Sequence, residues 1–305
     1  MKNKIVVGSR KSRLAMAQTR LVIAQLAKQF PETEFTIKKV VTEGDVNHGN
    51  LNQIGGKGIF VKEIERQLLD GQIDFAVHSL KDVKPTLPAG LMMGAYPRRS
   101  SPFDCLISEQ PFASLQDLPK GARVGTNSIR RQGQLLSLRP DLTIVPIRGN
   151  IDTRLKKIKT DHLAGVILAE SGLSRLGVDL SAYHVFSLAG VMMPAVGQGC
   201  LAIECRQDDP EVRKILATIN DKEAAQTAHI EREFMRELGG SCNFPIGAYA
   251  RREDGQLLFD GLIASPDGKH VIAKKKVVVD GPHTGKTVAD QLLKQDKFGI
   301  IKGED

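Results

Sequence analysis

A strand that ends in glycine and leads into a helix with hydroxyl side chains at its start occurs twice in this chain. The first copy is Val7-Gly8-Ser9-Arg10-Lys11-Ser12, and apolar residues at helical spacing follow as far as Phe30. The second copy is Val124-Gly125-Thr126-Asn127-Ser128-Ile129-Arg130, followed by a helical pattern to Leu138. A strand joined through a helix to the next strand forms a β-α-β unit, whose strands are parallel. We therefore expect two related α/β halves.

The remaining patterns extend each half and add a third region. In the first half, strands are expected at 4–8, 35–41 and 73–77, and helices at 12–30 and 60–69. In the second half, strands are expected at 123–125, 142–147 and 165–169, and helices at 128–138 and 151–158. Beyond residue 199 the patterns predict a strand at 201–205, a helical stretch at 211–238, hairpin strands at 247–252, 256–264 and 270–279, and a helix at 284–294. The predicted fold class is α/β with mixed, largely parallel sheets, plus a small α+β C-terminal domain.

Composition excludes several classes of protein. With 41% hydrophobic residues in 305, most of the chain cannot be intrinsically disordered. No apolar run approaches the roughly 20 residues that cross a bilayer, and the first apolar stretch is too short for a signal peptide, so we expect a cytoplasmic protein with no membrane partner. The net charge of +8 fits nucleic acid, an anionic membrane surface or a multiply anionic small substrate, and composition does not choose among them.

Cysteine and histidine spacing argues against disulfides and metals. The four cysteines are too few for a disulfide scaffold, so reduced thiols are expected. The histidines form no pair with cysteine at metal-ligand spacing, and no metal site is predicted. Cys200 and Cys205 have the pattern of small core residues, whereas Cys242 lies in a glycine-rich loop, where it is either a reactive or an inert thiol.

Anion binding is the strongest chemical signal. Backbone N–H groups at a helix start favour negative charge, and both copies of the repeat add hydroxyl and guanidinium donors there. The alternative is that Ser12 and Ser128 only cap helices and that the arginines are solvated. Further basic residues near segment ends are Arg148, Arg154 and Arg175, and Arg175 fits an unrelated surface position best.

A second candidate is the segment His78-Ser79-Leu80-Lys81-Asp82, which we expect directly after a buried strand. Its donors, Ser79 and Lys81, surround one acid, so it can bind an anion and also place the Asp82 carboxylate against a cationic or N–H-bearing centre. An ordinary capping aspartate explains the pattern equally well. His78 is interpreted as a structural histidine. The Gly55-Gly56-Lys57-Gly58 loop lacks the spacing of a phosphate-binding loop and is interpreted as a turn or lid.

Several blocks, in this order, resemble the porphobilinogen deaminase family over nearly the whole chain. They are Gly8-Ser9-Arg10-Lys11-Ser12-Arg13-Leu14-Ala15, Gly55-Gly56-Lys57-Gly58-Ile59-Phe60, His78-Ser79-Leu80-Lys81-Asp82, Val124-Gly125-Thr126-Asn127-Ser128-Ile129-Arg130-Arg131-Gln132, Ile147-Arg148-Gly149-Asn150, Pro194-Ala195-Val196-Gly197-Gln198-Gly199 and Cys242-Asn243-Phe244-Pro245-Ile246-Gly247.

The resemblance implies a hydroxymethylbilane synthase with two domains like the halves of a periplasmic binding protein. It implies a dipyrromethane cofactor bound by a thioether to Cys242, and a catalytic aspartate at Asp82 that stabilises cationic intermediates and assists proton transfer. The implied cofactor contacts are Ser79, Lys81, Thr126, Ser128, Arg130, Arg131 and Arg148. The implied substrate contacts are Arg10, Ser12, Lys57, Phe60, Arg154, Arg175 and Gln198. Porphobilinogen carries an acetate and a propionate, which suits this basic set.

The resemblance also implies domain boundaries. Domain 1 is expected at 1–98 and 199–217, domain 2 at 104–193 and domain 3 at 221–305, with Lys57 and Phe60 on a loop over the cleft. Two positions depart from the family pattern: Lys84 stands before Pro85 where proline often follows directly, and Gln53 stands where many members carry lysine. Neither departure touches Asp82 or Cys242.

Two other functions compete with this one. A solute-binding module with two α/β halves would need no covalent adduct at Cys242. A nucleic-acid-binding protein would need aromatic stacking platforms, and aromatic residues make up only 5% of the chain. The expected partner is therefore a small molecule, porphobilinogen, with no nucleic acid, and the family suggests a monomer.

Overall fold

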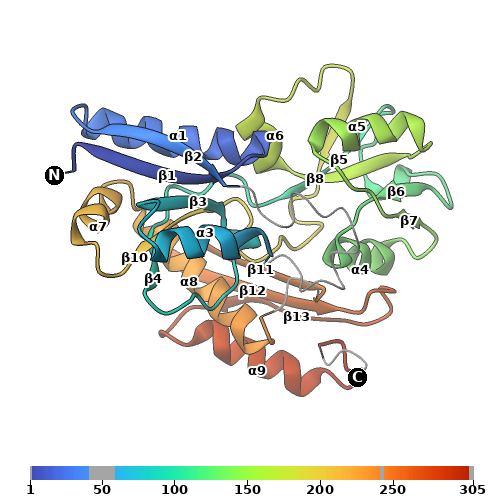
Figure 1. Cartoon of the computed structure of the whole chain (residues 1–305). Coiled ribbons are helices and arrows are strands. Elements are labelled where there is room, and N and C mark those ends of the chain that lie inside the picture. Colours follow the sequence, from blue (N-terminus) through green and yellow to red (C-terminus); the bar gives the residue numbers. More distant parts are fainter. Residues whose placement is uncertain (1, 41–58, 241–243, 302–305) are drawn as a thin grey trace. The chain divides into compact units, whose positions relative to one another are not determined.

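The computed structural model describes residues 2–40, 59–240 and 244–301 (Figure 1). By its internal contacts the chain divides into two compact units. The first unit comprises Met1–Ser100 and Gly199–His229, and the second comprises Ser101–Gln198 and Ile230–Asp305. Each unit is described separately.

The first unit contains a five-stranded sheet with the order β2-β1-β3-β10-β4. Strand β1 is parallel to β2 and β3, and β10 runs antiparallel between β3 and β4. Its elements are β1 (Lys4–Arg10), α1 (Arg13–Gln29), β2 (Glu34–Val40), α3 (Ile59–Leu69), β3 (Phe75–Ser79), the 3-10 turn η2 (Leu80–Asp82), β4 (Leu91–Ala95), β10 (Leu201–Arg206) and α7 (Pro210–Ala217).

The second unit contains a five-stranded sheet with the order β7-β6-β8-β5-β9 and a three-stranded antiparallel sheet with the order β11-β12-β13. Its elements are β5 (Asp104–Ser108), the 3-10 turn η3 (Leu115–Asp117), β6 (Arg123–Gly125), α4 (Ile129–Leu138), β7 (Thr143–Val145), α5 (Ile151–Thr160), β8 (Gly165–Ala169), α6 (Glu170–Leu176), β9 (His184–Ser187), β11 (Ile246–Glu253), β12 (Gln256–Ala264), β13 (Val271–Val278) and α9 (Thr284–Gln295). Helix α8 (Lys222–Glu237) contains the residue boundary between the units.

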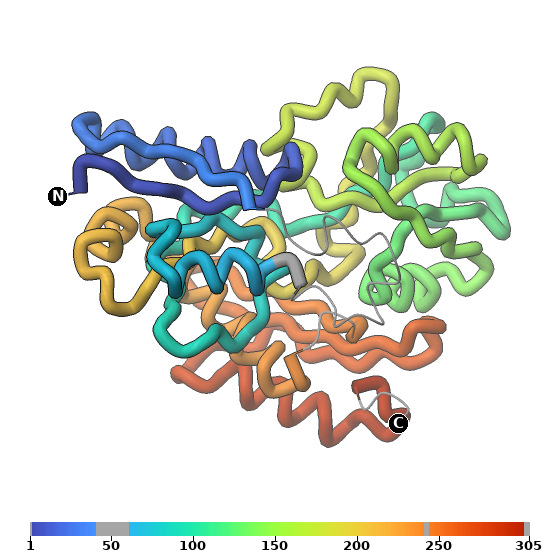
Figure 2. Tube along the Cα trace, in the orientation of Figure 1, coloured from blue at the N-terminus to red at the C-terminus, as the bar shows by residue number. Residues whose placement is uncertain are grey.

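The two five-stranded sheets have the same topology. In each, the first strand of the β-α-β unit, β1 or β6, lies between the second and the third. An antiparallel strand, β10 or β5, then lies between the third and an edge strand. The sequence repeat and the mixed, largely parallel sheets are therefore confirmed, and so are the antiparallel C-terminal sheet and its closing helix. Figure 2 traces this path along the chain.

Close packing explains why both copies of the repeat contain glycine. A Cβ atom added at Gly8 would lie 2.4 Å from Cδ1 of Ile73. A Cβ atom added at Gly125 would lie 2.9 Å from Cγ1 of Val166 in β8. In each unit the missing side chain makes room for a branched side chain from the neighbouring part of the sheet. The two glycines thus serve the packing of the sheet, and neither has a positive φ.

Several expectations from the sequence differ from the structure. Strand β1 runs on to Arg10 and does not end at Gly8, and β7 is shorter than the expected 142–147. The stretch 211–238 contains two helices, because Asp221 begins α8 by accepting a hydrogen bond from Ala224 N at 2.8 Å. Strand β3 lies two residues later than expected, since pairing with β10 extends it through His78 and Ser79. Those two residues therefore lie in the strand and do not follow it. Strands β4, β5 and β9 and helix α6 were not expected.

Two negative findings concern the described residues alone. Among them, no helix is both long enough and apolar enough to cross a membrane. Nor does any cluster of three or more histidine, cysteine, aspartate and glutamate side chains within 2–40, 59–240 and 244–301 have an arrangement that could hold a metal ion.

Candidate functional site

The carboxyl ends of parallel strands gather the predicted site residues of the first unit. Strand β1 ends at Arg10 and strand β3 at Ser79, and both strands point the same way. Ser12 at the start of α1 and the turn η2 directly follow these strands. Ligands of open α/β sheets bind at this edge. Of the other predicted residues here, Lys57 lies outside the described residues, and Phe60 is placed only as backbone in α3. Gln53, one of the two departures from the family pattern, also lies outside them.

Asp82 is presented by a short turn anchored on both sides. Leu80 and Val83 are each only 2% exposed, and Leu80 N donates to Cys200 O of the neighbouring strand segment at 3.1 Å. Val83 N donates to Leu80 O at 3.0 Å, which closes the turn. Lys81 and Asp82 lie between these two anchors and are half-buried. The turn therefore holds the Lys81 ammonium group and the Asp82 carboxylate at the sheet edge and leaves both side chains partly accessible.

The hydroxyl of Ser79 is held by helix α1. Nε2 of Gln18 donates to Oγ of Ser79 at 2.9 Å, and Gln18 is 3% exposed. At the next residue of the same helix, Oγ1 of Thr19 donates to Oγ of Ser9 at 2.9 Å. Gln18 thus positions Ser79, a predicted cofactor contact. Gln18 itself was not predicted from the sequence. The only signal for it was a polar residue on the apolar face of an amphipathic helix.

His78 is a structural histidine, as expected. It is 7% exposed, and its Nε2 lies 2.9 Å from Oε2 of Glu204, whose side chain is fully buried. This pair joins β3 to β10 immediately before Ser79. Burial raises the pKa of Glu65 on α3, and the nearby Glu204 carboxylate adds to the effect.

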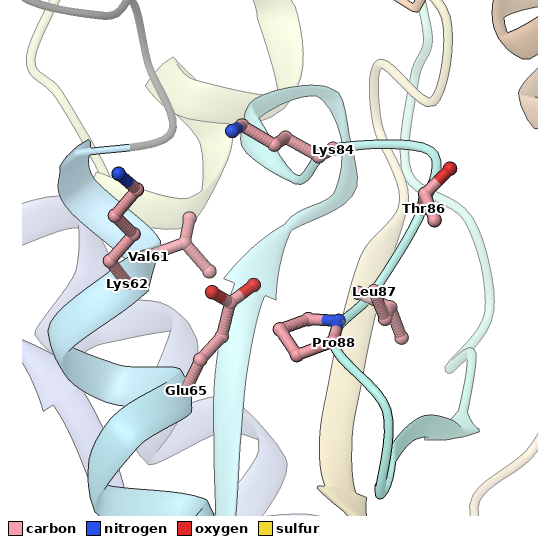
Figure 3. Close-up of a pocket in the computed structure, with 7 residues that line it drawn as sticks. All are labelled: Val61, Lys62, Glu65, Lys84, Thr86, Leu87 and Pro88. Carbon is pink, nitrogen blue, oxygen red and sulfur yellow. The ribbon is translucent and has the colours of Figure 1, made fainter.

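A pocket of about 350 Å³ opens between α3 and the segment after the turn η2 (Figure 3). Glu65 reaches into it from α3, and the side chains of Lys62 and Lys84 extend above Glu65 in this view. The lining residues are Val61, Lys62, Glu65, Lys84, Thr86, Leu87 and Pro88. The Lys84 departure from the family pattern therefore lies in this pocket wall. Among the described residues that line the pocket, none is a predicted site residue.

The second unit repeats the arrangement at its own sheet edge. Strands β6, β7 and β8 are parallel, so the residues that follow β6 and β7 lie at the same edge. Those residues are Thr126 and Ser128 after β6 and Arg148 after β7. Thr126 is 3% exposed, whereas Arg148 is exposed. The predicted anion-binding positions are thus brought together within this unit.

Both predicted serines cap their helices. Oγ of Ser12 accepts a hydrogen bond from Ala15 N at 3.2 Å, and Oγ of Ser128 accepts one from Arg131 N at 3.5 Å. Oγ1 of Thr126 accepts from Ser128 N at 3.2 Å. Capping by both serines is therefore confirmed, whereas the solvated arginines that the same alternative expected are not found at Arg130 and Arg131. Capping does not exclude ligand binding, because a capping hydroxyl keeps its own hydrogen to donate.

Arg130 and Arg131 are buried rather than solvated. They are 4% and 6% exposed, and each donates at 2.7 Å to a different oxygen of Asp104. Burial alone would raise the pKa of the Asp104 carboxyl, but the two guanidinium groups outweigh it and hold that pKa below its ordinary value. Asp104 was not predicted from the sequence. A single acidic residue at the start of an apolar strand could have indicated it.

The other predicted contacts of this unit have different surroundings. Nε of half-buried Arg154 donates to Gly149 O at 2.9 Å, beside the start of α5. Nε2 of Gln198, 1% exposed, donates to Pro102 O at 2.6 Å and to Oδ1 of Asp104 at 2.9 Å. Arg175 lies in the last turn of α6, the far end of that helix from the sheet edge.

Three of the four cysteines are buried in cores. Cys105, Cys200 and Cys205 are at most 1% exposed, which confirms Cys200 and Cys205 as core residues. Burial raises the pKa of Cys105 to about 12 and that of Cys205 to about 11. Such thiols hold almost no thiolate near neutral pH. Cys242, the predicted attachment point, lies outside the described residues.

Comparison with known proteins gives consistent matches along the chain. The family profile "Porphobilinogen deaminase, dipyromethane cofactor binding domain" matches residues 5–214, and "Porphobilinogen deaminase, C-terminal domain" matches residues 225–294. The chain is 66% identical over 305 residues to a porphobilinogen deaminase of Limosilactobacillus reuteri, covering 100% of both chains. It is 46% identical over 305 residues to one of Listeria welshimeri, covering 99% of this chain and 98% of the relative. A solved L-cystine solute receptor of Neisseria gonorrhoeae matches with a TM-score of 0.42 and 12% identity, covering 76% of this chain and 91% of that one.

Proposed function

This chain belongs to the porphobilinogen deaminase family, and we propose that Asp82 is its catalytic carboxylate and Cys242 its cofactor-bearing cysteine. The chain is a transferase (EC 2.5.1.61) that makes hydroxymethylbilane from four porphobilinogen molecules in tetrapyrrole biosynthesis. Each joining step forms one C–C bond, releases one ammonia and removes one proton from the attacked ring. Hydrolysis then releases the product: the C–C bond that holds the finished chain breaks, its methylene carbon gains the hydroxyl group of water, and the ring carbon left behind gains the proton.

The dipyrromethane cofactor, when bound, supplies the pyrrole carbon to which the first porphobilinogen is joined. The donor set at the start of α4 fits such a group, which carries an acetate and a propionate on each ring. Within the described part of the chain, the buried Nε atoms of Arg130 and Arg131 have no hydrogen-bond partner. Buried donors of this kind normally have one. We assign cofactor contacts to Ser79, Lys81, Thr126, Ser128, Arg130, Arg131 and Arg148.

The Asp82 carboxylate carries the proton and charge chemistry in this proposal. As ammonia leaves, positive charge develops on the pyrrole, and a carboxylate near the ring N–H groups stabilises that charge. The same oxygen atoms can accept the proton that the attacked ring carbon loses. The observation that carries the assignment is the position of Asp82 on an anchored turn at the sheet edge, with Lys81 beside it.

Substrate contacts are proposed for the remaining basic and polar positions. Each added ring brings two carboxylates, so a lengthening product needs a series of cationic and hydroxyl donors. The assigned residues are Arg10, Ser12, Lys57, Phe60, Arg154, Arg175 and Gln198. The parallel strands that place Arg10 at the same edge as Asp82 support its assignment most directly.

The assignment of Cys242 is supported by the state of the other thiols. Cys105, Cys200 and Cys205 are buried, and the high pKa values of Cys105 and Cys205 disfavour the nucleophilic thiolate. Cys242 follows helix α8 in the Gly-Gly-Ser-Cys sequence that matches the family.

The domain division remains our proposal: 1–98 with 199–217, 104–193, and 221–305. A separate hydrophobic core supports the third domain. This core contains Phe234 of α8, Phe259 of β12 and Val288 of α9, whereas the core beside β6 is built around Val124, Leu135 and Ile167.

We further propose a monomeric cytoplasmic enzyme whose partner is porphobilinogen, with no nucleic acid and no membrane partner. The family resemblance supports this proposal. Size-exclusion chromatography with light scattering tests the monomer directly, since a mass near 33.3 kDa is expected.

Intact-mass measurement with peptide mapping tests the attachment site. The wild-type protein should carry the mass of two linked pyrrole units on the peptide that contains Cys242. Cys242→Ser should lack it even after incubation with porphobilinogen. Cys200→Ser, which alters a buried thiol, is the matched control and should load normally. A persistent adduct in Cys242→Ser, or one mapped to another cysteine, would reject the assignment.

A further inference from the structure

The carboxylate of Asp104 contacts three of the residues that we propose as cofactor or substrate contacts. Its Oδ2 accepts from Nη2 of Arg130 at 2.7 Å, and its Oδ1 accepts from Nη2 of Arg131 at 2.7 Å. Oδ1 also accepts from Nε2 of Gln198 at 2.9 Å. Asp104 is the first residue of β5, its side chain is fully buried, and all four residues belong to the second unit. One buried acid thus joins side chains from a helix and from a distant segment of the chain.

Each of these three donors has a second anchor on the backbone. Nη1 of Arg130 donates to Met193 O at 2.6 Å, and Nη1 of Arg131 donates to Ile167 O at 2.7 Å. Nε2 of Gln198 also donates to Pro102 O at 2.6 Å. A guanidinium group held at two corners has little freedom to rotate. The orientation of both arginines is therefore set by the protein.

The charges at this cluster do not cancel. Two guanidinium groups face one carboxylate, which leaves one net positive charge in a buried place. Both Nε–H groups also lack a partner among the described residues. If Asp104 served only to neutralise buried charge, a second acid or a full set of acceptors would be expected. The surplus charge and the two spare donors suit an incoming carboxylate.

We propose that Asp104 is a positioning residue, which fixes Arg130, Arg131 and Gln198 in the orientation that receives carboxylates of the pyrrole rings before any ligand binds. This inference rests on the proposed ligand role of the two arginines. Preorganised donors bind without a further loss of side-chain freedom, so the benefit lies in ligand binding rather than in the chemical step.

Cofactor uptake by the apoprotein tests this directly. Apoprotein made without porphobilinogen is mixed with porphobilinogen, and intact mass follows the gain of two linked pyrrole units over time. Asp104→Asn replaces one acceptor oxygen with an NH2 group, so one guanidinium loses its partner. We expect uptake at least tenfold slower, half-maximal uptake at a higher porphobilinogen concentration, and an unchanged circular dichroism spectrum.

Asp260→Asn is the matched control. Asp260 is also a buried aspartate of the second unit, 9% exposed, and accepts from Nη1 of Arg251 at 2.9 Å. We expect uptake within twofold of wild type. Wild-type uptake by folded Asp104→Asn, or equal slowing by Asp260→Asn, would overturn the positioning role.

Two further variants separate this inference from the function on which it rests. Arg131→Lys should also slow uptake, and adding Asp104→Asn to it should cost less than in the wild-type background. Normal uptake by Arg131→Lys rejects the ligand role of Arg131 and with it the inference. If Asp104→Asn does not fold, Asp104→Glu keeps the charge but moves the carboxylate by one methylene. Slow uptake by that folded variant supports positioning, and wild-type uptake overturns it.

Discussion

Nε2 of His78 lies 2.9 Å from Oε2 of Glu204, and this buried contact ties the last part of β3 to β10. The next residues along the chain are Ser79 and the turn that carries Asp82. The turn η2 therefore begins from a strand end that two independent contacts fix. His78 binds Glu204 on the neighbouring strand β10, and Ser79 binds Gln18 on helix α1.

Glu204→Ala should destabilise the protein by about 1 to 3 kcal/mol, because it leaves the buried His78 ring nitrogen without its partner. Urea unfolding followed by circular dichroism measures this loss. The exposed Glu223→Ala, on helix α8, is the control and should change stability by less than about 0.5 kcal/mol. Equal stability of Glu204→Ala and wild type would mean that the His78–Glu204 contact contributes nothing to the folded state.

Asp82→Asn should retain the fold and the covalent cofactor while turnover falls by about 10² to 10⁴, the range typical for loss of a positioned acid–base group. The variant keeps the size of the side chain, so the anchors at Leu80 and Val83 should persist. Intact mass confirms loading, and release of ammonia from porphobilinogen gives the rate. A loaded variant with normal turnover would remove Asp82 from the chemistry.

The local signals in the sequence predicted much of the fold. A glycine in the last part of a strand, followed by a serine cap, marks the start of α1 and α4, and each signal depends on residues only a few positions apart. The edge strand β9 gave no such signal, since it is short and mostly exposed.

The candidate site was predicted less completely, because its residues are held by partners far along the chain. Asp104 is 26 residues from Arg130, and Gln18 is 61 residues from Ser79. Neither pairing has a periodic signature. The sequence predicted which side chains gather at the sheet edges, whereas only the structure shows which of them are buried and what holds them.

Gly133 on helix α4 should not tolerate alanine. In most helices this change stabilises by about 1 kcal/mol. Here the added Cβ would lie 2.6 Å from Ser265 O, a backbone atom directly after the end of β12. We expect Gly133→Ala to lower stability by about 1 to 3 kcal/mol, the usual cost of overpacking. Ser137→Ala, at an exposed position near the end of the same helix, is the control and should be nearly neutral. A more stable Gly133→Ala would show that α4 can move away from this sheet without cost.

Glu65 and Glu63 on helix α3 should show opposite dependence of stability on pH. Burial raises the pKa of Glu65, with Glu204 adding to this, while His78, Lys84 and Lys62 act in the opposite direction. Its ionised form is therefore disfavoured in the folded state, and the protein loses stability as pH rises from the ordinary glutamate pKa through the raised value. Glu65→Gln should thus raise the unfolding temperature at pH 8, and the gain should shrink towards pH 4.

Glu63 provides the matched control on the same helix. Hydrogen bonds from Arg66 and Gln67 lower the pKa of Glu63 to about 2. Its contribution to stability is present above the ordinary glutamate pKa and is lost as pH falls through about 2. Glu63→Gln should therefore lower the unfolding temperature at pH 8, with a smaller difference as the pH falls below 4. Thermal unfolding of both variants and wild type across this range gives the signs directly. Two differences of the same sign at pH 8 would contradict the assigned surroundings of one of the two carboxylates.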